Sequence, residues 1–265
     1  MTIRTEEERA GIVESCRRLG VILEEVGKAA QVGVSTATLD ELAEKLIREG
    51  GDEPAFLGYS PERSMRPYPA TLCISINEEV VHGIPNESPR ILKDGDIVAL
   101  DLGLIHKGFV SDSAITVAIG NVDETSKKLM EVTERSLYAG IKAARPGNRV
   151  GDISHAIEST FDGSGFSLVK VLGGHGVGAH VHEEPWIANV GHPGTGPELV
   201  EGMVLALEPI ANVGKAAVVI APDGYTYRTK DGSRSAHYEH TILIEKDATH
   251  ILTRRPGESV IGTAL

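Results

Sequence analysis

The sequence predicts an α+β fold in which two similar halves face each other across a cleft. Helical and strand-like patterns follow one another in the same order twice along the 265 residues. One stretch of the first half can also be laid over a stretch of the second half at a constant offset. In both halves, acidic residues stand inside or directly beside apolar runs, where a buried strand is expected.

The first half, about residues 1–120, begins with helices and continues with a sheet. Residues 5–29 carry apolar side chains at helical spacing, and 36–49 (TATLDELAEKLIRE) form a second helix with Ser35 or Thr36 as its N-cap. Three apolar and β-branched runs then predict strands at 71–76, 96–105 and 114–119.

The second half, about residues 121–253, repeats this order. Helical patterns return at 125–145 and 150–161, and strand-like runs follow around 166–172, 203–208, 216–221 and 240–245. Residues 32–47 overlay 146–161 at an offset of 114, which places Gly33 on Gly147 and Ile47 on Phe161. The repeat indicates duplication within a single domain, 1–265, whose halves share one sheet system.

Composition excludes several classes of function. A formal charge of −12 and a pI near 5.3 argue against nucleic acid or an anionic membrane as the main partner, because both need a basic footprint. Cys16 and Cys73 form no CxxC pair, so a disulfide framework is not expected and the compartment is reducing. We find neither a signal peptide nor a run of about 20 apolar residues, and expect a cytoplasmic protein.

Two aspartates in the first half need an explanation. Asp101 lies inside DIVALDLGLI and Asp112 inside FVSDSAITVAI, on either side of the turn HKG. If Ile105 pairs with Gly108, the two carboxylates are directly opposite, with Cβ atoms about 4.5–5.5 Å apart. Facing buried carboxylates either share a proton or hold a cation. The alternative is a slipped register with one aspartate exposed at a strand end.

The second half contains a matching pair. Glu208 ends MVLALE before Pro209, and Glu239 lies in AHYEHTILI before an apolar run. Each alone could be a solvated strand end, but four acidic groups with one histidine suit Mn²⁺, Fe²⁺ or Co²⁺, and Zn²⁺ is possible. Four carboxylates exceed the need of one ion, whereas two ions about 3.5–4 Å apart would use them and activate a bridging water.

The histidine comes from GGHGVGAHVHEEP, residues 173–185. His175 stands between glycines that allow close approach of backbones. His180 and His182 would share a face of an extended strand, and such a pair can itself bind metal. Spacing alone therefore does not rank the three histidines.

In combination, these motifs resemble type I methionine aminopeptidase. The resemblance rests on SINEEVVHGIP (75–85), the aspartate pair, GGHGVGAHVHEEP, MVLALEPI (203–210) and SAHYEHTILI (235–244), and runs from the first helix to about residue 253. It implies the pita-bread fold, with two pseudo-symmetric halves and antiparallel sheet around a dinuclear metal site. Xaa-Pro aminopeptidases and dipeptidases share HGVG and VHEEP, so they are the alternative, whereas NEEVVHGIP and YEHT separate the two groups. Relatives that have lost their metal are binding proteins, but here every ligand position is filled.

The resemblance assigns roles to individual residues. The metal ligands are Asp101, Asp112, His175, Glu208 and Glu239, with Asp112 and Glu239 bridging both ions. Glu208 would also move the proton. The histidines that contact substrate are His182, which donates to the oxyanion, and His82, which orients the scissile segment. His180 falls where the family does not hold histidine.

The methionine pocket looks altered. Tyr59, Tyr68 and Cys73 match the family, whereas Phe56, Val181 and Tyr225 replace the residues often found there, and SPERSMRP (60–67) is longer than usual. The implied reaction is removal of N-terminal methionine from nascent proteins and peptides, favoured by a small second residue. The implied protein is a monomer of the short form, with the ribosome exit region as a further partner.

Overall fold

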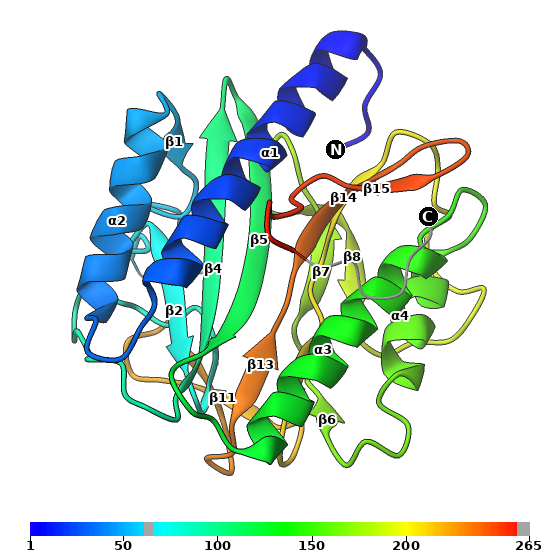
Figure 1. The fold of residues 1–265 in the computed structure, drawn as a ribbon. Helices are drawn as coiled ribbons and strands as arrows, with labels where there is room; N and C mark the ends of the chain where they lie inside the picture. Colours follow the sequence, from blue (N-terminus) through cyan, green and yellow to red (C-terminus); the bar gives the residue numbers. More distant parts are fainter. Residues whose placement is uncertain (61–65, 259–265) are drawn as a thin grey trace.

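The computed structural model describes residues 1–60 and 66–258. The first half contains two helices and five strands in the described part: α1 (Glu6–Ala29), α2 (Thr36–Glu49), β1 (Glu53–Pro54), β2 (Leu72–Ile76), β3 (Glu79–Val81), β4 (Ile97–His106) and β5 (Phe109–Ala118). Helix α1 packs on β4 and β5, and α2 packs on β2 (Figure 1). Both helices begin within one residue of the predicted positions.

The second half again begins with two helices. Its described elements are α3 (Glu124–Ala143), α4 (Val150–Ser159), β6 (Ser167–Leu168), β7 (Gly173–Gly176), β8 (Glu183–Ala188), β9 (Val204–Leu207), β10 (Ile210–Asn212), β11 (Val218–Ile220), β12 (Tyr227–Thr229), β13 (Ser235–His237), β14 (His240–Ile244) and β15 (Thr249–Ile251). Helix α3 contacts β13 and α4 contacts β8. The predicted run 166–172 is strand only at β6, and the next strand begins at Gly173.

Local sequence explains how the helices begin. Thr5 caps α1 with a capping box, since its side chain accepts from the Glu8 amide and the Glu8 carboxylate accepts from the Thr5 amide. Ser35 is the N-cap of α2 but makes no side-chain capping bond. The hydroxyl of Thr36, the other candidate, donates to the Pro85 carbonyl instead, 2.7 Å away.

The strands form several separate sheets, whereas one sheet system shared by the two halves was predicted from the sequence. In the described part, β4 pairs with β1, β2 and β5, and a five-stranded sheet runs β15-β14-β9-β7-β8. Smaller sheets run β13-β10-β6 and β11-β12-β3, and the latter joins a strand of the first half to two of the second. An antiparallel bridge from Ala114 to Glu239 links β5 to the start of β14, so the halves meet at a metal-ligand candidate.

The β4–β5 hairpin corrects the predicted register. His106 pairs with Phe109, and the two loop residues, Lys107 and Gly108, both have positive φ, as a type I′ turn requires. Asp101 therefore pairs with Ala114, and Asp112 pairs with Gly103. The slip moves the pairing by two positions, so both carboxylates stay on one face of the sheet but are diagonal neighbours.

The overlaid segments of the two halves make the same backbone bonds. Gly33 and Gly147 have φ of 90° and 87°, a region that favours glycine. Their amides donate to the carbonyls of Leu92 and Leu199 at 2.9 Å in each case. The same turn thus precedes α2 and α4.

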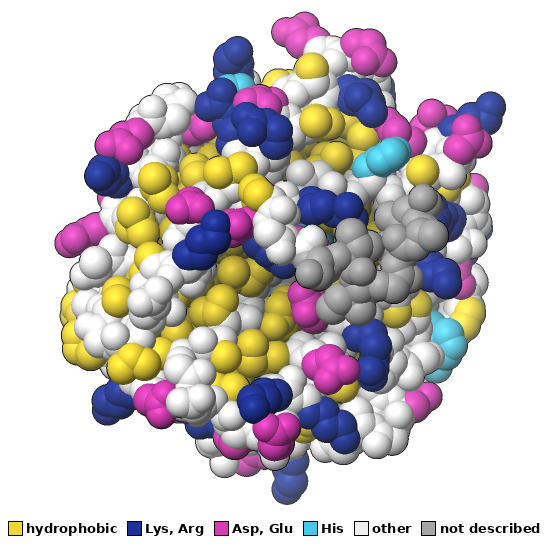
Figure 2. All heavy atoms as spheres, viewed as in Figure 1, with side chains coloured by type: hydrophobic (Ala, Val, Ile, Leu, Met, Phe, Trp, Pro, Cys, Tyr) yellow, Lys and Arg dark blue, Asp and Glu magenta, His cyan; other side chains and the backbone are white. Residues whose placement is uncertain are grey.

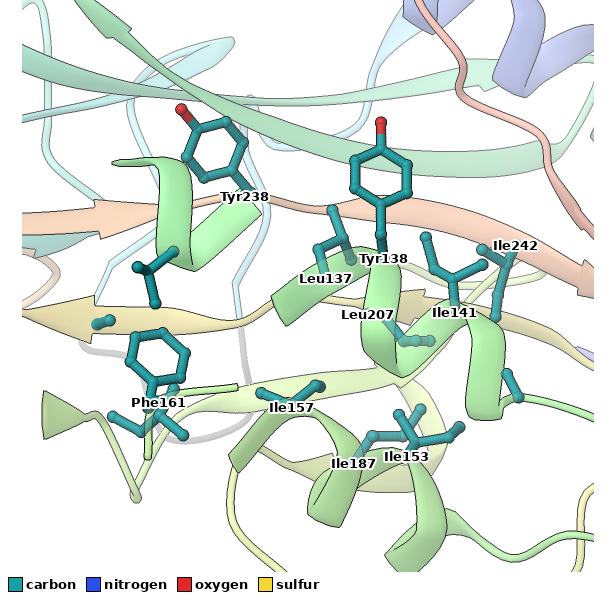
Figure 3. Packing of buried hydrophobic residues seen from close by; sticks show 14 of the residues in the cluster. Leu137, Tyr138, Ile141, Ile153, Ile157, Phe161, Ile187, Leu207, Tyr238 and Ile242 are labelled. Carbon is teal, nitrogen blue, oxygen red and sulfur yellow. The ribbon is translucent and has the colours of Figure 1, made fainter. Parts of the chain in front are cut away.

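Strand alternation separates the core from the cleft. In β4, Leu100, Leu102 and Leu104 join a cluster with α1 and α2, so Asp101 between them faces the other way. The second half has its own cluster, in which α3, α4 and the strands meet (Figure 3); its labelled residues are Leu137, Tyr138, Ile141, Ile153, Ile157, Phe161, Ile187, Leu207, Tyr238 and Ile242. On the helical face, charged side chains of both signs surround the apolar ones (Figure 2).

The segment after β15, residues 252–258, passes between the two halves on the helical side. Gly20 of α1 lies against it so closely that an added Cβ would be 2.8 Å from the Arg254 carbonyl oxygen. The carboxylate of Glu258 accepts a bond from Tyr138 of α3 and lies 3.0 Å from Nε2 of His240. Within residues 1–60 and 66–258, none of the helices is both long and apolar enough to pass through a bilayer.

Candidate metal centre and active site

A cavity of about 520 Å³ brings together the residues predicted from the sequence. Each of them lines it: Phe56, Tyr59, Tyr68, Cys73, His82, Asp101, Asp112, His175, Val181, His182, Glu208, Tyr225 and Glu239. The metal-ligand candidates come from both halves of the chain: Asp101 from β4 and Asp112 from β5 in the first half, and His175 from β7, Glu208 directly after β9 and Glu239 directly before β14 in the second. The cavity is therefore formed only when the halves are joined.

A metal ion fits the deepest part of the cavity. Asp112, His175 and Glu239 are buried, and each offers one ligand atom within 4.8 Å of the others. Among the described residues, Asp112 Oδ1, Glu239 Oε1 and Asp101 Oδ1 have no hydrogen-bond partner. Buried carboxylate oxygens without donors are costly, and a divalent cation is the group that would satisfy them.

The electrostatics agree with this interpretation. Burial, followed by repulsion from neighbouring carboxylates, raises the pKa of Asp112 and of Glu239 well above the ordinary range. Burial also raises the pKa of Asp101 to about 7. Carboxylates crowded in this way ionise readily only beside positive charge, which a bound cation provides.

Glu208 lies between two histidine rings. Its Oε1 is 3.5 Å from Nε2 of His175, and its Oε2 is 3.5 Å from Nε2 of His237. Nδ1 of His175 is 3.0 Å from the Gly176 carbonyl oxygen, so Nδ1 carries the proton and Nε2 is left free to bind metal. Burial tends to raise the pKa of Glu208, but His237, His175 and His182 hold it below the ordinary value.

The two histidines assigned to substrate are uncharged at neutral pH. Burial lowers the pKa of His82 to about 4, and desolvation with repulsion from His175 lowers that of His182 to about 4. The hydroxyl of Tyr59 is 2.7 Å from Nδ1 of His182. His82 has a positive φ of 58° and packs against the ring of Tyr227 at 5.8 Å.

The three histidines of the glycine-rich stretch are placed differently. The rings of His175 and His182 are 4.5 Å apart inside the cavity. His180 is exposed and does not line the cavity, and its backbone amide donates to Glu183. Residues 178–182 form a bend, so the HxH pair does not share a strand face.

The rest of the cavity is apolar and aromatic. Tyr68 and Tyr225 stack edge to face at 5.1 Å, and Tyr225 also donates to the Arg66 carbonyl. Phe56, Cys73 and Val181 are buried against the same wall. The lengthened stretch SPERSMRP lies largely outside the described residues, at 61–65.

His237 and Tyr227 also lie at the site, although they were not predicted from the sequence. Tyr227 lines the cavity, and His237 contacts Glu208 from behind it. The sequence spacing could have suggested His237, because it lies two residues before Glu239 in AHYEHT, which is the spacing of neighbours on one strand face. Tyr227 carried no comparable signal, because it reaches the site by pairing with β3.

Comparisons with known proteins identify one family and a group of similar sequences within it. Residues 10–246 match metallopeptidase family M24. The chain is 44% identical to methionine aminopeptidase 1 of Bacillus subtilis, covering 95% of this chain and 98% of that protein. It is 41% identical to methionine aminopeptidase 1 of Mycobacterium tuberculosis, covering 93% and 94%.

Solved structures show the same similarity. A methionine aminopeptidase from Thermotoga maritima superimposes with a TM-score of 0.91 at 40% identity, over 96% of this chain and all of that one (100%). A prolidase from Pyrococcus furiosus reaches a TM-score of 0.73 at 20% identity, over 96% of this chain and 65% of that one. The prolidase shares the fold alone.

Proposed function

The chain belongs to metallopeptidase family M24, and on that premise we propose that it removes the N-terminal methionine from proteins and peptides by metal-dependent hydrolysis. Within the family its likeness is to the methionine aminopeptidases, over nearly the full length of both chains. The alternative, an Xaa-Pro peptidase, has only distant support, because the prolidase and X-Pro aminopeptidase structures are 20% and 18% identical.

The observation that carries the proposal is the group of carboxylates near His175, each of which has one buried oxygen with no hydrogen-bond partner in the described part of the chain. We propose that Asp101, Asp112, His175, Glu208 and Glu239 hold two divalent ions, Fe²⁺, Mn²⁺ or Co²⁺, with Zn²⁺ as a further candidate. Asp112 and Glu239 would contact both. When bound, such ions supply a nucleophilic water and polarise the scissile carbonyl.

The side chains around them have the properties that hydrolysis requires. Glu208 keeps its charge among three histidines, so it can take a proton from the attacking water and pass it to the leaving amine. When the Tyr59 hydroxyl is the donor to Nδ1, neutral His182 carries its proton on Nε2, and this N–H can donate to the developing oxyanion. His82 also lines the cavity, and its proposed role is to orient the scissile segment.

Substrate choice follows from the cavity walls. The apolar surface of Phe56, Tyr68, Cys73 and Val181 suits an unbranched thioether side chain, and Tyr225 closes the same wall. Crowding beyond the first residue favours a small second residue. Nascent proteins are the proposed substrates, while the ribosome exit region as a partner, the monomeric state and the cytoplasmic location stay predictions.

A peptide panel tests the proposal. Peptides with methionine followed by Gly, Ala or Leu, and Xaa-Pro peptides, would be incubated with protein stripped of metal and reloaded separately with Mn²⁺, Fe²⁺, Co²⁺ or Zn²⁺. We expect free methionine from the Met-Gly and Met-Ala peptides, less from Met-Leu, and none without metal. Faster cleavage of Xaa-Pro peptides under every ion would replace the proposed function with its alternative.

A further inference from the structure

His237 is a buried polar side chain to which neither the resemblance nor the comparisons assign a role. It is 2% exposed, and in the described part of the chain neither ring nitrogen has a hydrogen-bond partner. Leaving both nitrogens unpaired in the interior is costly, so a ring held in this way needs an explanation.

The backbone fixes the direction of the ring. His237 pairs with Ile210 of β10, and Thr116 Oγ1 bonds to both its amide and its carbonyl, at 2.9 and 2.7 Å. With the backbone held in this way, Nε2 of His237 is 3.5 Å from Oε2 of Glu208, whereas Nε2 of His175 is 3.5 Å from Oε1.

The position suits a supporting role more than direct ligation. His237 does not line the cavity, and it is outside the group of described residues whose ligand atoms lie within 4.8 Å of one another. The charged group nearest to Nε2 is the second oxygen of Glu208, at 3.5 Å. That separation exceeds an ordinary hydrogen bond, as does the equal one from Oε1 to His175.

We propose that His237 is a positioning residue of the metal centre, whose Nε2–H donates to Oε2 of Glu208 when metal is bound and so leaves Oε1 for the metal. The inference rests on the proposed function of this site. A carboxylate held at one oxygen keeps its charge and cannot turn away from its ligand position. Partners that act on a metal ligand in this way typically contribute about 10–100-fold to metal affinity.

Two variants of the full chain test whether His237 donates a hydrogen bond or only fills space. His237→Leu fills the space without an N–H, whereas His237→Gln places an amide N–H at similar reach. Metal would be removed with a chelator, and Mn²⁺ and Co²⁺ titrated back by calorimetry, with the Co²⁺ absorption spectrum recorded. We expect the leucine variant to bind the weaker of its ions about 10–100-fold less tightly, and the glutamine variant to stay within about threefold.

His180→Ala is the matched control, because that histidine is exposed and outside the cavity. The melting temperature of each metal-free variant checks folding. If His237→Leu does not fold, His237→Asn replaces it, since its shorter amide cannot reach Glu208, and the same loss of affinity is expected.

Two results would overturn the inference. Wild-type affinity in the folded leucine or asparagine variant would show that His237 only fills space. A glutamine variant that loses as much affinity as leucine, with an altered Co²⁺ spectrum, would make His237 a ligand. Neither measurement uses a substrate, so a wild-type protein that binds metal but releases no methionine would refute the proposed function and leave this inference standing.

Discussion

The proposed function divides the residues of the cavity into those that hold metal and those that contact substrate. His182→Ala should reduce turnover on the order of 10²–10³-fold, the usual contribution of an oxyanion donor, with metal content unchanged. His180→Ala should stay within a few-fold of wild type, because its side chain is exposed and outside the cavity. Steady-state kinetics with metal analysis measures both. A larger loss of turnover in His180→Ala than in His182→Ala would contradict this division. So would metal that is lost when His182 is replaced but kept when His175 is replaced.

Asp112→Ala should abolish activity and weaken metal binding. Asp112 belongs to the tightest group of ligand candidates and has an oxygen with no donor among the described residues. Its removal takes away a contact to each of the two proposed ions. Calorimetry that finds the same metal binding as in wild type would remove Asp112 from the centre.

Val181 should control the width of the methionine pocket. It is buried in the apolar wall of the cavity, where its small side chain leaves room for bulky or branched analogues of methionine, although Phe56 fills part of that room. Val181→Phe should raise the preference for methionine over larger analogues, measured as the ratio of kcat/KM values. An unchanged ratio means that Val181 does not contact the substrate side chain.

Site residues could be predicted from the sequence where a local motif marked them. The ligand candidates lie beside local sequence features, such as the strand end at Glu208 and the glycines around His175, so their residue types and patterns indicated metal. The contact between Tyr59 and His182 joins residues 123 positions apart and has no local signal. Contacts of that kind appear only when the tertiary fold is known.

The positions of the helices were predicted from the sequence more accurately than the pairing of the strands. Helices α1 and α2 lie where periodicity placed them, because amphipathic spacing and the capping box at Thr5 are local. The hairpin register was wrong because the turn was placed one residue early. Gly108 accepts the positive φ of a type I′ turn, and the preference of such turns for glycine as the second loop residue would have selected Lys107–Gly108.

The repeated turn before α2 and α4 gives a prediction for these elements. Gly33→Ala and Gly147→Ala should each lower the free energy of unfolding by about 1–2 kcal/mol, the usual cost of a left-handed alanine. Apart from the glycine and its chain neighbours, no heavy atom of the described residues lies within 4 Å of a Cβ added at either position, so the expected loss comes from backbone strain. Urea unfolding measures it, and the matched asparagine variants should lose less. Clearly unequal losses at the two sites would show that the turns are not equivalent.

For the whole molecule, the contacts of Glu258 predict how stability depends on pH. Burial tends to raise the pKa of Glu258, but His240, Arg255 and Tyr138 lower it to about 2. A depressed carboxylate pKa stabilises the fold above the unfolded value of 4.5, and this contribution is lost as the pH falls toward 2. Glu258→Gln should cost about 2–3 kcal/mol at pH 7.

Urea unfolding at pH 7, 5 and 3 would measure this effect. The difference between wild type and Glu258→Gln should be nearly constant from pH 7 to 5 and should narrow below pH 4.5, where the unfolded carboxylate becomes protonated. The same difference at pH 3 as at pH 7 would mean that Glu258 acts through packing and not through its charge.

The bridge between β5 and the start of β14 also determines when the metal centre can form during folding. The Ser113 hydroxyl donates to the Glu239 carbonyl across 126 positions of the chain, and Ala114 bridges to the same residue. Contacts between such distant residues form late, because a long loop must close before they contribute stability. Bound metal should therefore slow unfolding and leave the refolding rate almost unchanged, since the ligands from the two halves meet only after the rate-limiting barrier.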